Sequence, residues 1–376
     1  MSPALVALSR LWRPSRWMID PAALRPGDLI LSTQRAVGSL LIRLGTRSAY
    51  SHAAVALGDG LLAEAVGLGV RRRSVTAVVK PRLLVRRLDP ALHPDAADIA
   101  ERAALETERC MHQGYWISGA MRALFVRTPP DRRGRMFCSQ LAAHAYQAAG
   151  AVALVPGKSA ENTTPADLAR SRALITVAAV YRPALVPGYL VDDSFESLAD
   201  SETVAVQATF VRACDWLEAH GLGRPPHWIG LQQQLATLRP VQLQQELDHH
   251  VTQWLTADGY FHLITRARHE VLEPLEELAG TAGAPKDGHR GDRMEFFLMA
   301  HGRAALAKQS ADEAENAAVY RELLATAPLQ TFDMLGWRSE ANSAVSARAV
   351  EAIDTILAAL DARHGFTSSA PEDLRA

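Results

Sequence analysis

The sequence predicts an α+β domain followed by an all-helical domain. Residues 24–90 are short strand-like apolar runs separated by Gly, Pro and Asp, whereas beyond about residue 190 apolar residues recur every three to four positions. A chain of 376 residues also exceeds the usual size of one hydrophobic core, which favours two domains. In the first part strands and helices are segregated rather than alternating, and this pattern is typical of α+β proteins.

Charge divides the chain in the same way. Residues 1–190 hold 25 Lys and Arg against 13 Asp and Glu, a formal charge of +12, whereas residues 191–376 hold 15 against 28, a formal charge of −13. A change of sign on this scale indicates two units with different roles. The basic half would favour an anionic substrate or membrane surface. It lacks the basic clusters and aromatic spacing of a nucleic-acid-binding module, so we expect no nucleic-acid partner.

The N-terminal residues predict a basic arm over 1–22. Arg10, Arg13 and Arg16 interrupt a short apolar run, which is not the pattern of a signal peptide. Two interpretations remain, namely a helix packed on the domain and an amphipathic arm that touches an anionic membrane. No run reaches the roughly 18 apolar residues that span a bilayer. We therefore expect a cytoplasmic location by default, with leaderless export as the alternative.

The elements of the first domain follow from turn residues and periodicity. Pro26-Gly27-Asp28 begins a strand that runs to residue 32, and Gly58-Asp59-Gly60 lies between two apolar runs that read as a β-hairpin over 51–70. The remaining expected elements are strand over 75–89, helix from Pro94 to Met121, a helix over 138–149 closed by Gly150, and strand over 175–183.

The second domain is expected to be acidic and helical over 191–376, with no motif that indicates a chemistry. Its apolar residues recur at helical spacing, and the segments close on glycine. The predicted helices cover 203–221, 240–259, 260–280 and 343–365, and residues 280–292 are expected to form a loop.

Cys138 is the candidate nucleophile. The chain has three cysteines without a C-x-x-C pair, so free thiols are expected. Cys138 begins a predicted helix, where unpaired amides and the helix dipole favour the thiolate. Arg132, Arg133 and Arg135 lie just upstream and should add positive charge. The competing interpretation is a small buried side chain at the start of a core helix.

His52 and Glu64 are the candidate partners of this cysteine. His52 begins the first strand of the hairpin, and Glu64 is a lone carboxylate in the returning apolar strand. If Gly58-Asp59-Gly60 is a three-residue loop, Leu57 faces Leu61 and Ala54 faces Glu64, so that Glu64 shares a face with His52. A two-residue loop would place the two side chains on opposite faces. The sequence alone does not decide between the two loop lengths.

These segments together resemble a known family. The runs "PGDLILS", "SHAAVALGDGLLAEAVGLGV", "FCSQLAAHAYQAAG" and "TPADLARS" are similar to the circularly permuted NlpC-type branch of papain-like cysteine hydrolases, the YiiX/YebB-like group, over residues of about 23–185. In that branch the histidine strand precedes the cysteine helix. The lecithin–retinol acyltransferase group shares this order, but "FCSQ" does not match its signature.

The resemblance implies a permuted papain-like catalytic domain over 23–190, with Cys138 as nucleophile, His52 as base and Glu64 as the residue that orients it. Tyr50 is a candidate for oxyanion or substrate contact, and a packing role is the alternative. The implied function is hydrolysis of an amide bond, in a peptide, a cell-wall peptide or an N-acyl amide, through a thioester and without cofactor or metal. The alternatives are a lipid acyl-ester hydrolase or acyltransferase at an anionic membrane, and an inactive binding scaffold whose helical domain binds a protein partner.

Structural or solvent-exposed positions are expected for the other cysteines, the run of three arginines and the histidines of the second domain. Cys110 and Cys214 lie in helical patterns without a nearby base, so core thiols are expected. "RRR" at 71–73 continues the hairpin and supports no more than a solvated edge or an anionic contact. No H-x-x-x-H spacing accompanies the histidines of the second domain, so surface positions rather than a metal site are expected for His249, His250, His262 and His269, with Glu270 beside them.

Overall fold

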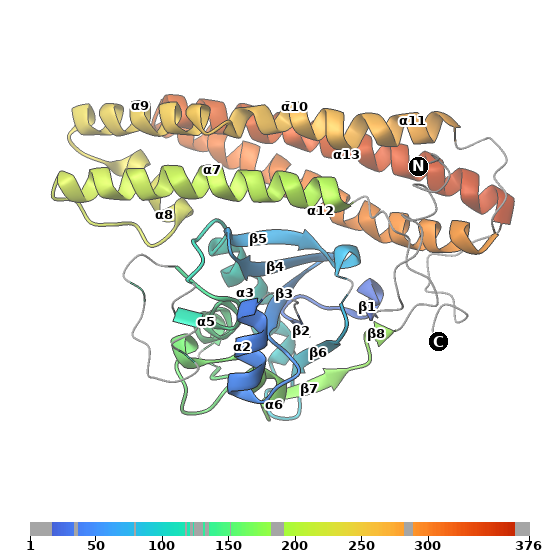
Figure 1. The fold of residues 1–376 in the computed structure, drawn as a ribbon. Helices are drawn as coiled ribbons and strands as arrows, with labels where there is room; N and C mark the ends of the chain where they lie inside the picture. The colour runs from blue at the N-terminus through green and yellow to red at the C-terminus, as the bar shows by residue number, and fades with distance from the viewer. Residues whose placement is uncertain are drawn as a thin grey trace. The chain divides into compact units, whose positions relative to one another are not determined.

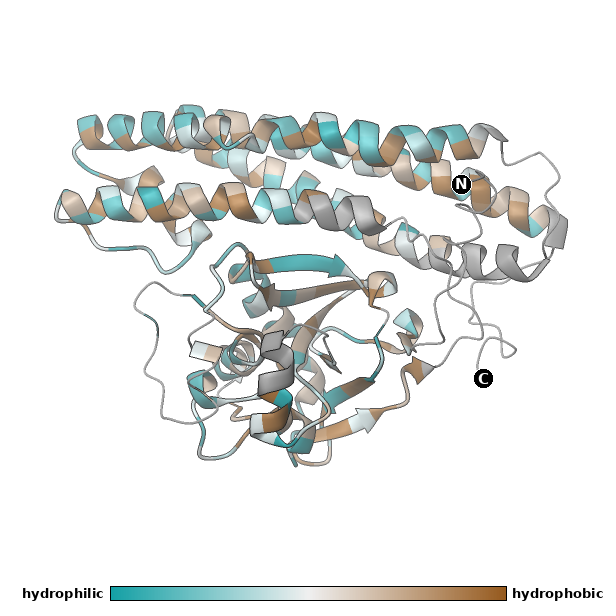
Figure 2. Ribbon diagram, viewed as in Figure 1, coloured by the Kyte–Doolittle hydropathy of each residue, from teal (hydrophilic) through white to brown (hydrophobic). Residues whose placement is uncertain are grey.

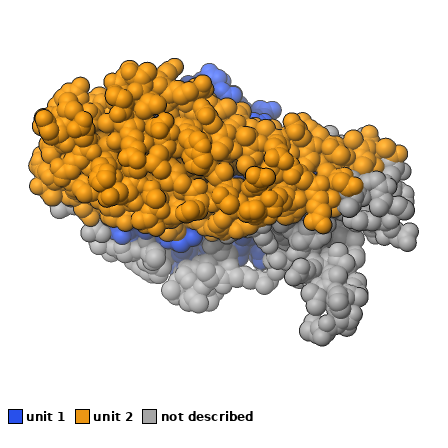
Figure 3. Space-filling view, turned by 90° about the horizontal axis from the view of Figure 1, so that it is seen from above, with its two compact units in different colours: residues 1–193, 287–302, 364–376 blue, residues 194–286, 303–363 orange. Residues whose placement is uncertain are grey.

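A computed structural model describes residues 17–33, 37–78, 80–116, 119–120, 123, 131, 135–150, 152–181, 192–281 and 289–364. It confirms an α+β domain followed by a helical region (Figure 1). The chain forms two compact units, coloured separately in Figure 3: unit 1 comprises residues 1–193, 287–302 and 364–376, and unit 2 comprises residues 194–286 and 303–363. Helix α12 therefore contributes residues to both units.

Unit 1 is built on an antiparallel sheet of six strands in the order β5-β4-β3-β2-β6-β7. The sheet brings strands distant in sequence together, since β6 pairs with both β2 and β7. A separate two-stranded pair joins β1 (Met18–Ile19) to β8 (Val180–Tyr181). The six strands are β2 (Leu29–Ser32), β3 (His52–Gly58), β4 (Leu61–Val66), β5 (Gly69–Ser74), β6 (Leu83–Leu88) and β7 (Leu174–Val177).

The two faces of the sheet bury different partners. One face packs on helices α3 (Ala96–Arg109) and α5 (Cys138–Gly150), and its core contains Ala53 of β3 together with Cys138. The other face packs on short segments, with Ile19 of β1 against Ala54 of β3. Alternating side chains of one strand thus enter different cores, as strand geometry requires. Other described elements of unit 1 include α2 (Val37–Thr46), α6 (Pro165–Arg170) and the 3₁₀ turns η1 (Pro21–Ala23), η2 (Val75–Ala77) and η3 (Ala160–Asn162).

The β3–β4 hairpin has a two-residue turn and a β-bulge. Gly58 pairs with Leu61 across Asp59-Gly60, and both turn residues have positive φ, at 48° and 80°. The register then shifts between Ala56 and Gly58, so that Ala54 still pairs with Glu64. Of the two pairings that a three-residue loop would give, Leu57 with Leu61 is not formed, whereas Ala54 with Glu64 is formed.

Several expected elements are altered. The segment expected as strand over 75–89 begins with η2, and β6 starts only at Leu83. The strand expected over 175–183 is divided into β7 and β8, and the helix expected from 94 to 121 ends at Arg109. Trp17, Met18 and Ile19, which we assigned to an N-terminal arm, form β-bridge pairings, and Met18 and Ile19 are buried. Residues 1–16 lie outside the described part of the chain.

Unit 2 is made of helices whose polar and apolar residues alternate along their length (Figure 2). Helix α8 and the long α12 were not expected, and the expected loop over 280–292 gives way to helix at His289. None of the described helices has a stretch apolar and long enough to span a membrane. The helices are α7 (Asp192–Ala219), α8 (Trp228–Thr237), α9 (Val241–Ala257), α10 (Leu263–Ala267), α11 (Glu273–Thr281), α12 (His289–Thr326) and α13 (Gln330–His364), with a 3₁₀ turn η4 (Tyr260–His262) and a π turn η5 (Arg268–Leu272).

Candidate active site

Cys138 is the first residue of α5. The first hydrogen bond of the helix runs from the Leu141 amide to the Phe137 carbonyl, at 2.9 Å, so Phe137 is the N-cap residue. The Phe137 amide donates to Gln140 Oε1 at 3.4 Å. The side chain of Cys138 is buried, and Leu141 and Ala142 behind it are fully buried in the same core. The helix therefore holds the thiol at its positive end with little freedom.

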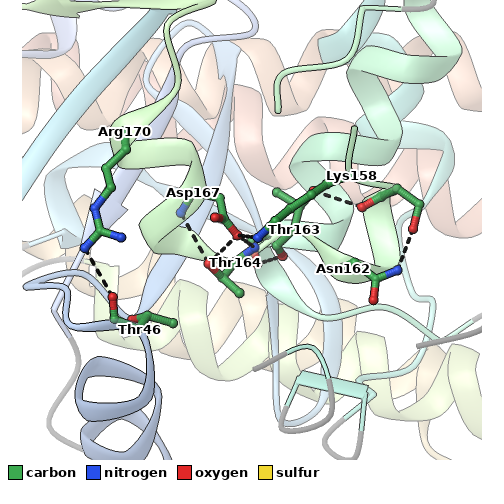
Figure 4. A network of polar contacts seen from close by, with 9 residues as sticks. Thr46, Lys158, Asn162, Thr163, Thr164, Asp167 and Arg170 are labelled. Carbon is green, nitrogen blue, oxygen red and sulfur yellow. Dashed lines mark hydrogen bonds and ion pairs between the residues drawn. The ribbon is translucent and has the colours of Figure 1, made fainter. Parts of the chain in front are cut away.

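A polar network anchors the start of α5. Ser139, which is fully buried, donates from Oγ to the Thr163 carbonyl at 2.8 Å. Thr164 caps α6 by a capping box with Asp167, and Lys158 binds the same carboxylate at 2.8 Å, as Figure 4 shows. The loop that receives the Ser139 hydrogen bond is thus itself fixed next to the candidate nucleophile.

His52 and Glu64 are in direct contact. The distance between His52 Nε2 and Glu64 Oε2 is 2.7 Å, and both side chains are buried, with 5% and 3% of their surface exposed. Because Ala54 pairs with Glu64, the carboxylate lies two residues along β3 from His52 on the same face. Because Nε2 of His52 contacts Glu64, Nδ1 is the ring nitrogen that remains to interact with Cys138.

The electrostatics of Cys138 and His52 are linked. Burial opposes ionisation of Cys138, but the charge and hydrogen bond of His52 and the amides of Ala53 and Ser139 lower the pKa of the thiol below its ordinary value. Burial also opposes a charged imidazole, yet the Cys138 charge and hydrogen bond and the Glu64 carboxylate raise the pKa of His52 to about 9. These opposite shifts favour a thiolate–imidazolium pair at neutral pH.

Two arginines of β5 hold the other oxygen of Glu64. Arg71 donates to Glu64 Oε1 from Nη2 at 2.9 Å and from Nε at 3.2 Å, and Arg73 Nη1 lies at 3.4 Å from the same oxygen. Burial would raise the pKa of Glu64, but His52 and then the two arginines hold it well below its ordinary value. Arg71 is 8% exposed, so the solvated edge expected as one alternative at 71–73 is wrong for this residue, whereas its contact is with an anion, the Glu64 carboxylate.

The remaining predicted site residues take different positions. Tyr50 packs, half-buried, against the core cluster that contains Cys138, and its oxyanion role stays a prediction. Arg135 is paired with Asp131 at 3.0 Å, so its charge is compensated there. Arg132 and Arg133 lie outside the described residues.

Tyr115 is a neighbour of the site that sequence reasoning missed. Burial and then the charge of Cys138 raise the pKa of its phenol, which places the ring within electrostatic reach of the thiolate. A bridge between Tyr115 and Met136 brings this residue to the start of α5, and no sequence pattern announces that pairing.

The other cysteines and histidines have ordinary surroundings. Burial raises the pKa of Cys110 to about 12 and that of Cys214 to about 11. His249 is exposed, and the half-buried His250 stacks on Trp254 with ring centroids 5.3 Å apart. Within the described residues, no group of three or more His, Cys, Asp or Glu is arranged to hold a metal ion.

Comparison with known proteins gives one partial relative. The chain is 40% identical over 78 residues to a protein of Escherichia coli (strain K12) named "Probable lipoprotein peptidase YaeF". The matched stretch is 20% of this chain and 28% of that protein. No family model matches the chain, and no solved structure matches it.

Proposed function

We propose that this chain is a peptidase-like cysteine hydrolase that forms a thioester on Cys138 and cleaves an amide bond. The observation that carries the proposal is the buried series Cys138, His52 and Glu64, in which the imidazole contacts both the thiol and the carboxylate. A nucleophile, a base and a group that orients the base, within hydrogen-bonding reach of one another, are the requirements of covalent catalysis by cysteine.

The mechanism follows from the charge state of the pair. The Cys138 thiolate attacks the carbonyl carbon, and the electron pair of the C=O bond moves to the oxygen. The Cys138 amide at the start of α5 is a suitable donor to that oxyanion. The His52 imidazolium gives its proton to the leaving amine as the C–N bond breaks. Neutral His52 then takes a proton from water, which attacks the thioester carbonyl. The C–S bond breaks, the carboxylic acid leaves, and the thiolate–imidazolium pair is restored.

The class of substrate is a second part of the proposal. The partial relative is named a probable lipoprotein peptidase, which supports an amide bond over an ester. The order of the segments in the sequence also supports a permuted papain-like domain. A peptide, a cell-wall peptide or an N-acyl amide is the substrate class we favour.

An acyl-enzyme trap on the full chain tests the proposal. The chain is incubated with an N-acylated lipopeptide, a cell-wall stem peptide and anionic phospholipid vesicles, and is then quenched in acid for intact-mass measurement. We expect an acyl adduct and a released amine with one of the two peptides, both abolished in Cys138→Ala and slowed by about 10³-fold in His52→Ala.

The other results contradict the proposal in distinct ways. Fatty-acid release from vesicles alone would identify an acyl-ester hydrolase. No product from any of the three, together with a Cys138 that iodoacetamide labels no faster than Cys110 and Cys214, would identify a binding scaffold.

A further inference from the structure

The three consecutive arginines of β5 are divided between the two faces of the sheet. Arg71 pairs with Glu64 in the β4–β5 ladder and Arg72 with Ala63, so that their side chains alternate. Arg72 binds Glu108 of α3 at 3.3 Å on the opposite face. Figure 2 shows β5 as a hydrophilic strand beside less polar β4. The strand therefore supplies cations to Glu64 and a chemically matched arginine that is paired with Glu108 instead.

The two oxygens of the Glu64 carboxylate have separate partners. Oε2 contacts His52 at 2.7 Å, whereas Oε1 receives two N–H groups of Arg71 and a longer contact from Arg73. Both Arg71 N–H groups converge on Oε1, so this oxygen is anchored by charge-assisted hydrogen bonds while Oε2 is held by His52. Rotation of the Glu64 carboxylate would break contacts at both ends, so its orientation toward His52 is enforced.

The arginines also change the charge balance of the site. With Cys138 and His52 ionised, the site carries three positive and two negative charges, counting Glu64, the buried Arg71 and the half-buried Arg73. Without the arginines the two carboxylate and thiolate charges would face a single imidazolium. Such a site would hold the His52 proton more tightly and would stabilise the thiolate less.

We propose that Arg71 is a positioning residue that acts through Glu64. By binding Oε1 it orients the carboxylate toward His52 and offsets its charge, so that His52 is aligned and still able to release its proton to the leaving group. This inference rests on the proposed function of Cys138 and His52. Arg73 contributes in the same direction through its longer contact.

The groups that face His52 come from several elements. Cys138 of α5, Glu64 of β4 and the arginines of β5 are charged or titratable, and Tyr115 lies near Cys138. On the neighbouring strand β2 the residue opposite His52 is Ser32, which is uncharged. Arg72 and Glu108 form their own pair on the other face.

The experiment measures both partners of the pair in the full chain. The titration of His52 is followed by NMR of ¹³C-labelled histidine, assigned with His52→Gln, and that of Cys138 by its iodoacetamide alkylation rate against pH. Arg71→Gln removes the charge but keeps a donor to Glu64, whereas Arg71→Lys keeps the charge. Arg72→Gln removes a charge from the same strand that is paired with Glu108 and not with Glu64.

We expect Arg71→Gln to raise the pKa of His52 above about 9 and the alkylation midpoint of Cys138, each by about one pH unit. Arg72→Gln should leave both within about 0.3 unit of the wild type, well inside the ordinary spread of histidine pKa values in proteins. Arg71→Lys keeps the charge but has fewer N–H groups placed for Oε1, so it should shift both by less than Arg71→Gln does. If Arg71 had only a structural role, Arg71→Gln would loosen the contact between Glu64 and His52. The pKa of His52 would then fall toward its free value of about 6.5.

The inference is overturned if Arg71→Gln leaves the His52 titration unchanged or lowers it, or if Arg71→Lys shifts it as far as Arg71→Gln does. Should Arg71→Gln fail to fold by circular dichroism, Arg73→Gln carries the same test with a smaller upward shift. A wild-type Cys138 that titrates near the free-thiol value of about 8.5 would instead refute the proposed function, whatever the variants do.

Discussion

Glu64 reaches His52 across the β3–β4 hairpin because Leu57 bulges from the ladder. The turn contains two residues, and a regular ladder from the Gly58–Leu61 pair would set Glu64 opposite Val55, on the face away from His52. The bulge adds one residue to β3 and restores the pairing of Glu64 with Ala54. The carboxylate then comes within 2.7 Å of the imidazole. A local irregularity of the backbone therefore decides whether the candidate site is complete.

Removal of the Glu64 charge should weaken the thiolate–imidazolium pair. Glu64→Gln keeps the size of the side chain but no longer favours a charged imidazole, so the pKa of His52 should fall from about 9. The alkylation midpoint of Cys138 should rise at the same time. Histidine NMR and alkylation rates measure both, and a His52 titration that does not move would mean that Glu64 has no electrostatic role. The expected direction for His52 is opposite to that of Arg71→Gln.

The same carboxylate should make stability depend on acid pH. The folded pKa of Glu64 is depressed, so its stabilising contribution is complete above the unfolded value of about 4.3 and is lost as pH falls toward the folded pKa. Urea unfolding from pH 7 to 3 should show a decline that Glu64→Gln reduces by up to about 1.4 kcal/mol per pH unit. Equal slopes in the two proteins would contradict this assignment.

Ser139→Ala should destabilise unit 1. The hydroxyl is fully buried and donates to the Thr163 carbonyl, so its removal leaves a buried acceptor unsatisfied. The expected cost is about 1–3 kcal/mol in the free energy of unfolding. Thr355→Ala, which removes an exposed hydroxyl bonded within its own helix, is the control and should cost less than about 0.5 kcal/mol. Equal losses of unfolding free energy in Ser139→Ala and Thr355→Ala, measured by urea unfolding, would show that the buried Ser139 hydrogen bond stabilises the protein no more than an exposed one.

Arg338→Ala should strongly destabilise unit 2. Arg338 is 4% exposed, binds Glu202 at 3.0 Å and lies over the ring of Tyr260 at 4.1 Å. Its loss removes a buried cation that binds Glu202 and lies 3.8 Å from Glu313, at a cost of about 3–5 kcal/mol. Arg321→Ala breaks an exposed pair with Glu340 and should cost at most about 1 kcal/mol. Thermal and urea unfolding by far-UV circular dichroism compare the two, and similar losses would contradict the ranking.

Much of the candidate site could be predicted from the sequence, because its parts lie in short segments with strong local signals. The helix start at Cys138, the strand start at His52 and the carboxylate in an apolar run at Glu64 each follow from periodicity and turn residues. The resemblance to a permuted family supplied their roles. Their register could be stated only as a condition on the hairpin loop, since a bulge leaves no mark in the pattern of apolar residues.

The arginine contacts were missed for a physical reason. Three consecutive arginines read as solvent-facing, because charged side chains are seldom buried without partners. The signal was present in the turn at Gly67-Leu68: pairing of Val66 with Gly69 sets Arg71 opposite Glu64. The position of Tyr115 was even harder to predict from the sequence, since it depends on a single bridge to Met136 between segments distant in sequence. The long helix α12 was not expected either, because its start lies in a glycine-rich segment that reads as a loop.

The most direct test of the central claim is the pH dependence of Cys138 alkylation by iodoacetamide in the wild type and in His52→Ala. We expect a wild-type midpoint well below the value of about 8.5 for a free thiol, and a midpoint at or above that value in His52→Ala. Cys110 and Cys214, whose pKa values are raised by burial, serve as internal controls and should stay unlabelled at neutral pH. A Cys138 that reacts no faster than these two, or whose midpoint is unaffected by His52→Ala, would contradict the thiolate–imidazolium pair.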